Sequence, residues 1–285
     1  MSHNPSLAGR RVLITGAARG IGAATAKRLH ARGARVALAG IEPEELAAVA
    51  AACGDAPWSE CNVADRAEVE AAVESSVEAL GGLDVVMANA GVAAQLPIVG
   101  GNPEVFERTI AVNVLGVYYT LRAAGPHISH PGGYALAISS LAAAVHPPLL
   151  GAYSASKAAV EGLADAMRIE VRPSGAKVGV AYFGELDTDM TSRGFGTRAA
   201  TRLFEGLRFP QRVTPLEAGL AAIEAGITKR SRRVVAPRWV AGLLPIRDLA
   251  QRVVERGTGD VSAALEIARE EDAPLTTPQP DQTRV

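Results

Sequence analysis

The stretch that decides the fold is residues 11–22, with the sequence RVLITGAARGIG. Its first five residues are mostly apolar and predict a buried strand, and residues 21–31 continue at helical spacing. Between them, Gly16, Gly20 and Gly22 permit a tight turn and a close approach of the backbone to a ligand. The N-terminus of the helix would offer free N–H groups and positive partial charge to a pyrophosphate. Because such a turn also occurs without a ligand, the elements that surround it along the chain must show whether it binds one.

The rest of the chain repeats this alternation of short apolar runs and longer amphipathic stretches. We predict strands at residues 11–15, 34–40, 56–62, 83–88, 134–138, 178–183 and 233–236. We predict helices at residues 21–31, from 43 onward, 66–80, 103–124, 152–171 and from the capping box Thr214–Glu217 to about 227. Asp65 is the expected N-cap of the helix at 66–80. This order is typical of βαβ units. It predicts an α/β fold, a Rossmann-type doubly wound parallel sheet of about seven strands with helices on both faces.

Two regions interrupt the alternation and set the expected domain organisation. We predict a tail at residues 1–8 and a single dinucleotide-binding and catalytic domain at 9–255. Within that domain, 189–211 would form a substrate lid and 237–255 a C-terminal helical extension. A further helix is expected at 256–270, and the Pro- and Thr-rich residues 271–285 are expected to be disordered. The apolar stripe from Trp239 to Val253 could cover the protein's own core, a subunit contact or a membrane surface, and we favour the first two.

Composition excludes several classes of protein. The chain has 285 residues, 48% hydrophobic and 21% charged, with a net charge of −1. Such a chain has enough apolar material for a large core and lacks the basic surface that wholesale nucleic-acid binding needs. Two cysteines, Cys53 and Cys61, cannot build a disulfide framework, so we expect a cytoplasmic protein. Neither a signal peptide nor a spanning run of apolar residues is visible, and we expect no membrane contact.

A tyrosine and a lysine point to acid–base chemistry. Tyr153 and Lys157 are four residues apart and share one face of the predicted helix 152–171. A neighbouring ammonium group favours phenolate and would lower the tyrosine pKa from its usual value of about 10. An ordinary amphipathic face gives the same spacing. Ser140, however, ends a predicted strand at the sheet edge where open α/β folds bind ligands.

With these motifs the sequence resembles the classical short-chain dehydrogenase/reductase family, over roughly residues 9–237. The resemblance rests on several motifs in the family's order. These are the turn Thr15–Gly22, Asn89-Ala90-Gly91 after the fourth strand, Asn113 in residues 112–116, Ser140 with Tyr153 and Lys157, and Gly184 with Thr188. It implies an NAD(P)-dependent oxidoreductase that interconverts a carbonyl and a secondary alcohol. A non-catalytic dinucleotide-binding sensor on the same fold is the alternative, although a sensor would not need the complete set of polar residues.

The resemblance also assigns roles to residues. Tyr153 would exchange a proton with the substrate oxygen, Ser140 would hydrogen-bond that oxygen, Lys157 would bind the ribose and lower the Tyr153 pKa, and Asn113 would hold a water that passes protons to Lys157. The substrate-contacting residues would be Ser140, Ala142, His146 and Tyr153. The cofactor-binding residues would be Gly16, Arg19, Gly20, Ile21, Gly22, Gly40, Ile41, Asn62, Val63, Asn89, Ala90, Gly91, Tyr153, Lys157, Gly184, Leu186 and Thr188.

Two departures from the family's pattern matter for the cofactor. Phe183 stands where the family usually has proline, which should reshape the turn under the nicotinamide. Gly40 stands where NAD-preferring members have an acid that repels the 2′-phosphate of NADP. Arg19 could bind that phosphate, whereas Glu42 could replace the missing acid. Together these residues favour NADP as the cofactor, and NAD remains an alternative.

The remaining expectations concern substrate, metal and assembly. The Leu, Val and Pro content of residues 142–150 suggests an apolar small-molecule carbonyl or alcohol. His127 and His130 lack a nearby third ligand, so we expect no metal site. The basic residues 229–233 are expected to form a solvated loop, with no nucleic-acid partner. The family commonly assembles through the helices that here span 103–124 and 152–171, so we expect a homodimer or homotetramer.

Overall fold

The computed structural model of the protein describes residues 6–188, 197–205 and 213–270. Its centre is a seven-stranded sheet in the order β3-β2-β1-β4-β5-β6-β7, in which every neighbouring pair is parallel. The strands are β1 (Arg11–Thr15), β2 (Arg35–Gly40), β3 (Trp58–Glu60), β4 (Val85–Ala88), β5 (Tyr134–Ile138), β6 (Lys177–Phe183) and β7 (Arg233–Ala236). The predicted doubly wound parallel α/β sheet is therefore confirmed.

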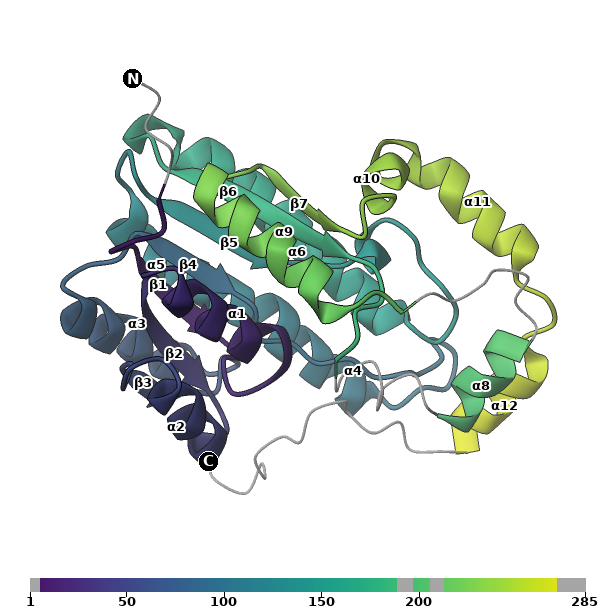
Figure 1. The fold of residues 1–285 in the computed structure, drawn as a ribbon. Helices are drawn as coiled ribbons and strands as arrows, with labels where there is room; N and C mark the ends of the chain where they lie inside the picture. Colours follow the sequence, from purple (N-terminus) through teal and green to yellow (C-terminus); the bar gives the residue numbers. More distant parts are fainter. Residues whose placement is uncertain (1–5, 189–196, 206–212, 271–285) are drawn as a thin grey trace.

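Helices cover both faces of this sheet (Figure 1). One face carries α1 (Gly20–Ala31), α2 (Pro43–Ala51) and α9 (Leu216–Lys229), and the other carries α3 (Arg66–Leu80), α5 (Gly116–Ile128) and α6 (Gly151–Glu170). Successive strand side chains enter opposite cores, as the pleat requires: Val12 and Ile14 pack on the α1 side and Leu13 on the α3 side. Both faces of the central strands are buried, which explains their continuous apolar sequences.

The N-cap predicted for α3 is present. The Asp65 carboxylate accepts hydrogen bonds from the backbone N–H groups of Ala67 (2.7 Å) and Glu68 (3.0 Å). At the other end Gly81 is left-handed, with φ of 72°, a conformation that glycine adopts without a steric penalty. The Asp65 side chain thus caps the N-terminus of this helix, and the left-handed Gly81 ends it.

The predicted helix 103–124 is interrupted. It begins as α4 (Pro103–Ile110), widens into a π-helical turn at Ala111–Leu115, and continues as α5 to Ile128. The π-helical turn carries Asn113, whose side-chain amide bonds to the backbone of Val92 on the neighbouring loop. A shift of the helical hydrogen-bond register at this residue leaves no compositional mark, which is why helical spacing alone missed it.

The predicted capping box at α9 is also wrong. Pro215 is the N-cap, and no side chain caps the helix. Instead Thr214 pairs through its backbone with the segment after β6: its N–H donates to Glu185 (2.8 Å), and its carbonyl accepts from Asp187 (2.9 Å). This long-range pairing places Thr214 in a strand-like bridge, so its side chain does not cap the helix.

Beyond β7 the chain forms a helical arch at one end of the sheet (Figure 1). It consists of α10 (Val240–Leu243), a 3₁₀ turn at Leu244–Ile246, α11 (Arg247–Gly257) and α12 (Ser262–Glu270). α12 packs against α8 (Arg198–Glu205) through a small apolar cluster that includes Leu203, Ala264 and Ala268. α8 is the described part of the predicted lid, and the remainder of that lid and the predicted disordered tail 271–285 lie outside the described residues.

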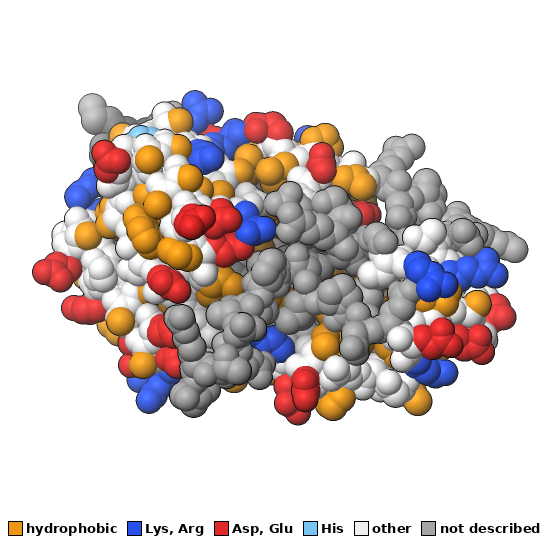
Figure 2. All heavy atoms as spheres, turned by 90° about the horizontal axis from the view of Figure 1, so that it is seen from below, with side chains coloured by type: hydrophobic (Ala, Val, Ile, Leu, Met, Phe, Trp, Pro, Cys, Tyr) orange, Lys and Arg blue, Asp and Glu red, His pale blue; other side chains and the backbone are white. Residues whose placement is uncertain are grey.

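One face of the molecule carries both acidic and basic side chains. On the face that Figure 2 shows, acidic and basic side chains lie interspersed among apolar ones. In the part of the chain that the structure describes, no helix combines the length and the apolar character needed to cross a bilayer.

Candidate active site

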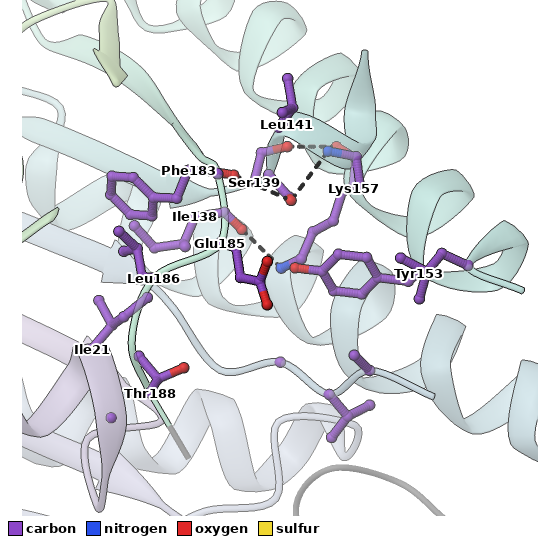
Figure 3. Close-up of a pocket in the computed structure, with 18 of the residues that line it drawn as sticks. Ile21, Ile138, Ser139, Leu141, Tyr153, Lys157, Phe183, Glu185, Leu186 and Thr188 are labelled. Carbon is purple, nitrogen blue, oxygen red and sulfur yellow. Dashed lines mark hydrogen bonds between the residues drawn. The ribbon is translucent and has the colours of Figure 1, made fainter. Parts of the chain in front are cut away.

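A cavity of about 780 Å³ opens at the carboxyl edge of the parallel sheet. The turn after β1, the ends of β2, β4, β5 and β6, and the first turns of α6 line its inner part. The outer part is lined by the 3₁₀ turn after β5 and by the helical arch. Figure 3 shows the inner part, where Tyr153 and Lys157 extend from α6 toward the segment that follows β6. This is the edge at which open α/β sheets bind ligands.

The glycine turn forms a cradle in which neither Gly16 nor Gly22 leaves space for a side chain. A Cβ at Gly22 would lie 2.1 Å from the Gly16 carbonyl oxygen, and one at Gly16 would lie 2.7 Å from the Ala90 Cα. Asn89 closes the turn from below by donating to the carbonyls of Thr15 (2.9 Å) and Gly16 (3.1 Å). The first turn of α1 has no acidic residue and no side-chain cap, so none of the side chains of this turn competes with a ligand for its positive end. The cradle fits a dinucleotide pyrophosphate.

At the adenosine end of this cradle, the two residues that would compete to select the cofactor bind each other. Arg19 Nε donates to Glu42 Oε2 (2.8 Å), and the Arg19 Nη2 group contacts the other carboxylate oxygen. Glu45 lies 3.8 Å from the same guanidinium. Gly40, Ile41, Asn62 and Val63 line the same end of the cavity, as predicted for an adenosine site.

Lys157 is buried at the centre of the site. Its Nζ donates to the Ile138 carbonyl (3.0 Å) and lies 5.5 Å from the centroid of the Tyr153 ring. Burial lowers the pKa of Lys157 to about 8. Ser139 anchors this part of α6 to β5 because its hydroxyl donates to the Lys157 carbonyl (2.8 Å). The ammonium group is thus held where it can act on a ribose and on the phenol.

Tyr153 and Ser140 line the cavity together. Burial raises the pKa of Tyr153, and a hydrogen bond with Ser140 offsets only part of that rise. The expectation that Lys157 lowers the Tyr153 pKa stays a prediction, because in the chain by itself desolvation of the phenolate sets the direction of the shift. The Ser140 hydroxyl also accepts from the Ala142 N–H (3.1 Å), which fixes its position at the start of the 3₁₀ turn.

Asn113 lies behind the cavity rather than in its lining. Its Oδ1 accepts from the Val92 N–H (2.8 Å), and its Nδ2 donates to the Val92 carbonyl and to the Ser156 hydroxyl (2.9 Å each). A Cβ at Gly91 would lie 3.2 Å from Asn113 Oδ1 and 3.4 Å from Lys157 Nζ. Asn113 therefore braces the loop beside Lys157, and this close approach accounts for the glycine at position 91.

The structure brings most of the predicted residues together and separates one. Gly22 supports the cradle from behind, and the other predicted cofactor residues line the cavity, as do Ser140 and Ala142. His146 does not line it. Its Nδ1 lies 3.0 Å from the Ala142 carbonyl and its backbone N–H donates to Gln251 (2.8 Å), so it joins the loop to α11.

Phe183 leaves the turn after β6 in place. Its side chain is buried in the core on the α1 side, while the Gly184 N–H continues the sheet by donating to Ala236 (2.9 Å). Within the described ranges, no group of three or more His, Cys, Asp or Glu side chains could hold a metal ion.

Sequence reasoning missed two parts of the lining. The first is Glu185, which follows Gly184 directly; its place between Gly184 and Thr188 was the available signal. The second is the stripe that begins at Trp239: Val240 and Leu244 pack into the core on the α3 side, in line with one of the predicted alternatives, whereas the rest of its apolar side chains line the outer cavity. Its lining residues are Trp239, Leu243, Ile246, Leu249, Ala250, Val253 and Val254.

Comparisons with known proteins agree with this geometry. The family model for short chain dehydrogenases matches residues 10–199. The 3-alpha-(or 20-beta)-hydroxysteroid dehydrogenase of Mycobacterium tuberculosis is 33% identical over 239 residues, which cover 83% of this chain and 92% of that protein. The L-2,3-butanediol dehydrogenase of Corynebacterium glutamicum is 34% identical over 186 residues, 62% of this chain and 72% of that protein.

Two solved structures are similar in fold. A short chain dehydrogenase from Burkholderia cenocepacia in complex with NADP is 31% identical, with a TM-score of 0.71, and the match covers 80% of this chain and 96% of that one. A short chain dehydrogenase/reductase from Burkholderia phymatum in complex with NAD is 20% identical, with a TM-score of 0.74, over 90% of this chain and 97% of that one.

The chain belongs to the short-chain dehydrogenase family. It is an NAD(P)-dependent oxidoreductase of hydroxyl and carbonyl groups on small molecules, and the alternative of a non-catalytic sensor is not favoured.

Proposed function

We propose that the protein reversibly reduces the carbonyl of an apolar ketone or aldehyde to an alcohol, with Ser140, Tyr153 and Lys157 as its reactive group and Asn113 as the residue that positions the loop beside them. The observation that carries this proposal is the single cavity in which Ser140, Tyr153 and Lys157 lie between a phosphate cradle and an apolar wall. A dinucleotide bound there would supply or accept the hydride.

The residues of the chain would hold and move the proton. The Tyr153 hydroxyl would donate to the carbonyl oxygen during reduction and accept the proton during oxidation. Ser140 would donate a second hydrogen bond to the same oxygen and fix its position. Lys157 would bind the ribose hydroxyls and favour the phenolate electrostatically, while Asn113 would hold the loop that carries Gly91 beside it.

The predicted cofactor residues would bind the dinucleotide along the sheet edge. The cradle would hold the pyrophosphate, Asn62 and Val63 would contact the adenine, and Leu186 and Thr188 would contact the nicotinamide. Because Glu42 already pairs with Arg19, NADP binding would require the guanidinium to exchange a carboxylate for the 2′-phosphate. We propose NADP as the preferred cofactor, with the Glu42 carboxylate as the element that limits the preference.

The apolar character of the proposed substrate is supported by the outer cavity. Leu141, Val145 and Leu150 line it on one side, and the helical arch supplies Trp239, Leu243 and Leu249 on the other. The named relatives act on a hydroxysteroid in one case and on butanediol in another, so they leave the size of the substrate open.

Assembly, location and domain limits complete the proposal. Exposed apolar side chains on α4, the π-helical turn, α5 and α6 support a homodimer or homotetramer; they are Phe106, Leu115, Tyr118 and Ile169. Two free, buried cysteines, Cys53 and Cys61, support a cytoplasmic location. We propose that residues 9–255 act as one domain, with 189–211 as a substrate lid.

The test is turnover by the wild-type enzyme. Loss of reduced-nicotinamide absorbance on addition of apolar ketones and aldehydes, with either dinucleotide, is the expected result. A dinucleotide that binds tightly while none of the carbonyls is reduced would contradict the proposal and favour a sensor.

A further inference from the structure

Glu185 lines the cavity on a backbone segment that is held by hydrogen bonds. The preceding residue, Gly184, donates its N–H to the Ala236 carbonyl (2.9 Å). The Glu185 carbonyl accepts a hydrogen bond from the Thr214 N–H (2.8 Å). Asp187 then donates back to the Thr214 carbonyl (2.9 Å). Because hydrogen bonds hold the backbone on both sides of Glu185, its side chain leaves the segment in a set direction.

That direction is toward the reactive residues. Figure 3 shows the Glu185 side chain pointing into the cavity, on the side where the ends of Tyr153 and Lys157 lie. The next residue, Leu186, also borders the cavity, but its side chain packs in the core on the α1 side and approaches α9 at Gly219. The alternation of an extended segment therefore presents Glu185 to a bound substrate.

The carboxylate has no partner among the described residues. It makes no hydrogen bond and no ion pair there, although Glu42 in the same cavity pairs with Arg19. Lys157 donates to Ile138 and forms no ion pair with Glu185 within the described chain. Burial also raises the pKa of Glu185. A half-buried carboxylate without a hydrogen-bond partner is unfavourable among apolar side chains. A ligand that donates a hydrogen bond to it would remove this cost and bind more tightly.

We propose that Glu185 determines substrate specificity by accepting a hydrogen bond from a hydroxyl or ammonium group carried beside the reacting carbon of an otherwise apolar alcohol or ketone. This inference rests on the proposed function and narrows its substrate class. The substrate combines an apolar body, which contacts Leu141, Leu243 and Leu249, with one hydrogen-bond donor. A purely apolar analogue leaves the carboxylate buried without a partner.

The size of the preference follows from that penalty. A hydrogen bond to a charged group favours the donor-bearing substrate by roughly 10- to 100-fold over an analogue without a donor. A site built to hydrogen-bond its substrate rejects analogues that lack the donor more strongly than an apolar pocket rejects a missing methylene. The preference belongs to substrate recognition, so dinucleotide affinity stays unchanged when Glu185 is replaced.

The experiment compares four alcohols of one skeleton as substrates for oxidation. They are 1-phenylpropan-2-ol, 1-phenylpropane-1,2-diol, 1-amino-1-phenylpropan-2-ol and 1-methoxy-1-phenylpropan-2-ol. The first and the last have no donor beside the reacting carbon, and they bracket the diol in size. kcat/KM is measured for the wild type, Glu185→Leu and Glu185→Gln. Dissociation constants of the four alcohols are measured by calorimetry with the reduced dinucleotide bound, so that no alcohol is oxidised during the titration, and that of the dinucleotide is measured separately.

The wild type is expected to favour the diol and the amino alcohol over both alcohols without a second donor by roughly 10- to 100-fold, in kcat/KM and in binding. Glu185→Leu is expected to abolish both preferences. Glu185→Gln, which keeps the shape and a neutral acceptor, is expected to lose the ammonium preference and to keep part of the hydroxyl preference. An unequal response to the two donors identifies which of them the site accepts.

Three results would overturn the inference: equal use of the four alcohols by the wild type, a preference that survives both substitutions, or a dinucleotide affinity that falls as much as the preference. Failure of the proposed function looks different. In that case no alcohol is oxidised, and a binding preference that depends on Glu185 would still support the specificity role.

Discussion

The two walls of the cavity are built in different ways. The inner wall belongs to the sheet and its connecting turns, where Gly16 and Gly22 leave no space for a side chain and Lys157 is buried. The outer wall is α11, which has no buried residue and is tied to the body by the Arg247–Glu161 ion pair (2.8 Å) and the Gln251–His146 contact. The groups that must be positioned closely thus lie on rigid elements, while apolar side chains on a loosely attached helix would meet the variable part of a substrate.

The largest effect is expected where the inner wall is tightest. A Cβ in the Gly22→Ala variant would overlap the Gly16 carbonyl, so the cradle must shift. We expect dinucleotide affinity to fall by about 100-fold or more, because small displacements of a binding group are costly. A fluorescence titration with the dinucleotide measures this change in its dissociation constant.

The matched control is Gly162→Ala in α6, where an added Cβ meets nothing within 4 Å. That variant should bind the dinucleotide as the wild type does. A Gly22→Ala protein with normal affinity would show that the cradle is not the phosphate site.

The second prediction concerns pH and the buried lysine. Burial holds the pKa of Lys157 at about 8, so its ammonium form predominates below that pH and is lost above it. We therefore expect kcat/KM for carbonyl reduction to fall as the pH rises through about 8, since this ratio reports groups of the free enzyme. The rate profile of Lys157→Met, though much slower, should lack this limb; a limb unchanged in that variant would assign it to another group.

The third prediction concerns the ion pair at the adenosine end. Glu42→Ala removes the nearest carboxylate partner of Arg19, while Glu45 stays 3.8 Å from the guanidinium, and should shift the ratio of the NADP and NAD dissociation constants toward NADP by about tenfold. Arg19→Ala should weaken NADP and leave NAD nearly unchanged. If Arg19→Ala binds NADP as well as the wild type, Arg19 does not bind the phosphate. If the wild type prefers NAD and Glu42→Ala abolishes that preference, Glu42 is the selector.

The smallest effect is expected on the outer wall. The Leu249 side chain is 57% exposed and lines the cavity, so an apolar substrate that covers it gains about 1 kcal/mol. Leu249→Ala should raise KM for apolar ketones about fivefold and leave dinucleotide affinity alone. Arg256→Ala, on the same helix but outside the lining, is the control. A parallel loss in both variants would show that α11 acts only through stability.

The sequence predicted the inner wall far better than the outer one. Glycine spacing, apolar strands and the Tyr153–Lys157 pair are local patterns, and they identified the sheet and the residues that meet at its edge. The π-helical turn at Asn113 escaped because a register shift has no compositional signature. Spacing reveals the charge of Lys157 beside Tyr153 and not the burial that raises the Tyr153 pKa. Glu185 and α11 acquire their positions from contacts between distant segments, which periodicity does not encode.

The central claim is that Tyr153 is the proton donor in a cavity that binds a dinucleotide beside it. The most direct measurement is turnover and dinucleotide affinity in Tyr153→Phe, which removes the phenolic hydroxyl and keeps the ring. We predict a fall in kcat/KM for carbonyl reduction of at least about 100-fold, with the dinucleotide dissociation constant nearly unchanged. Activity retained in this variant would contradict the account.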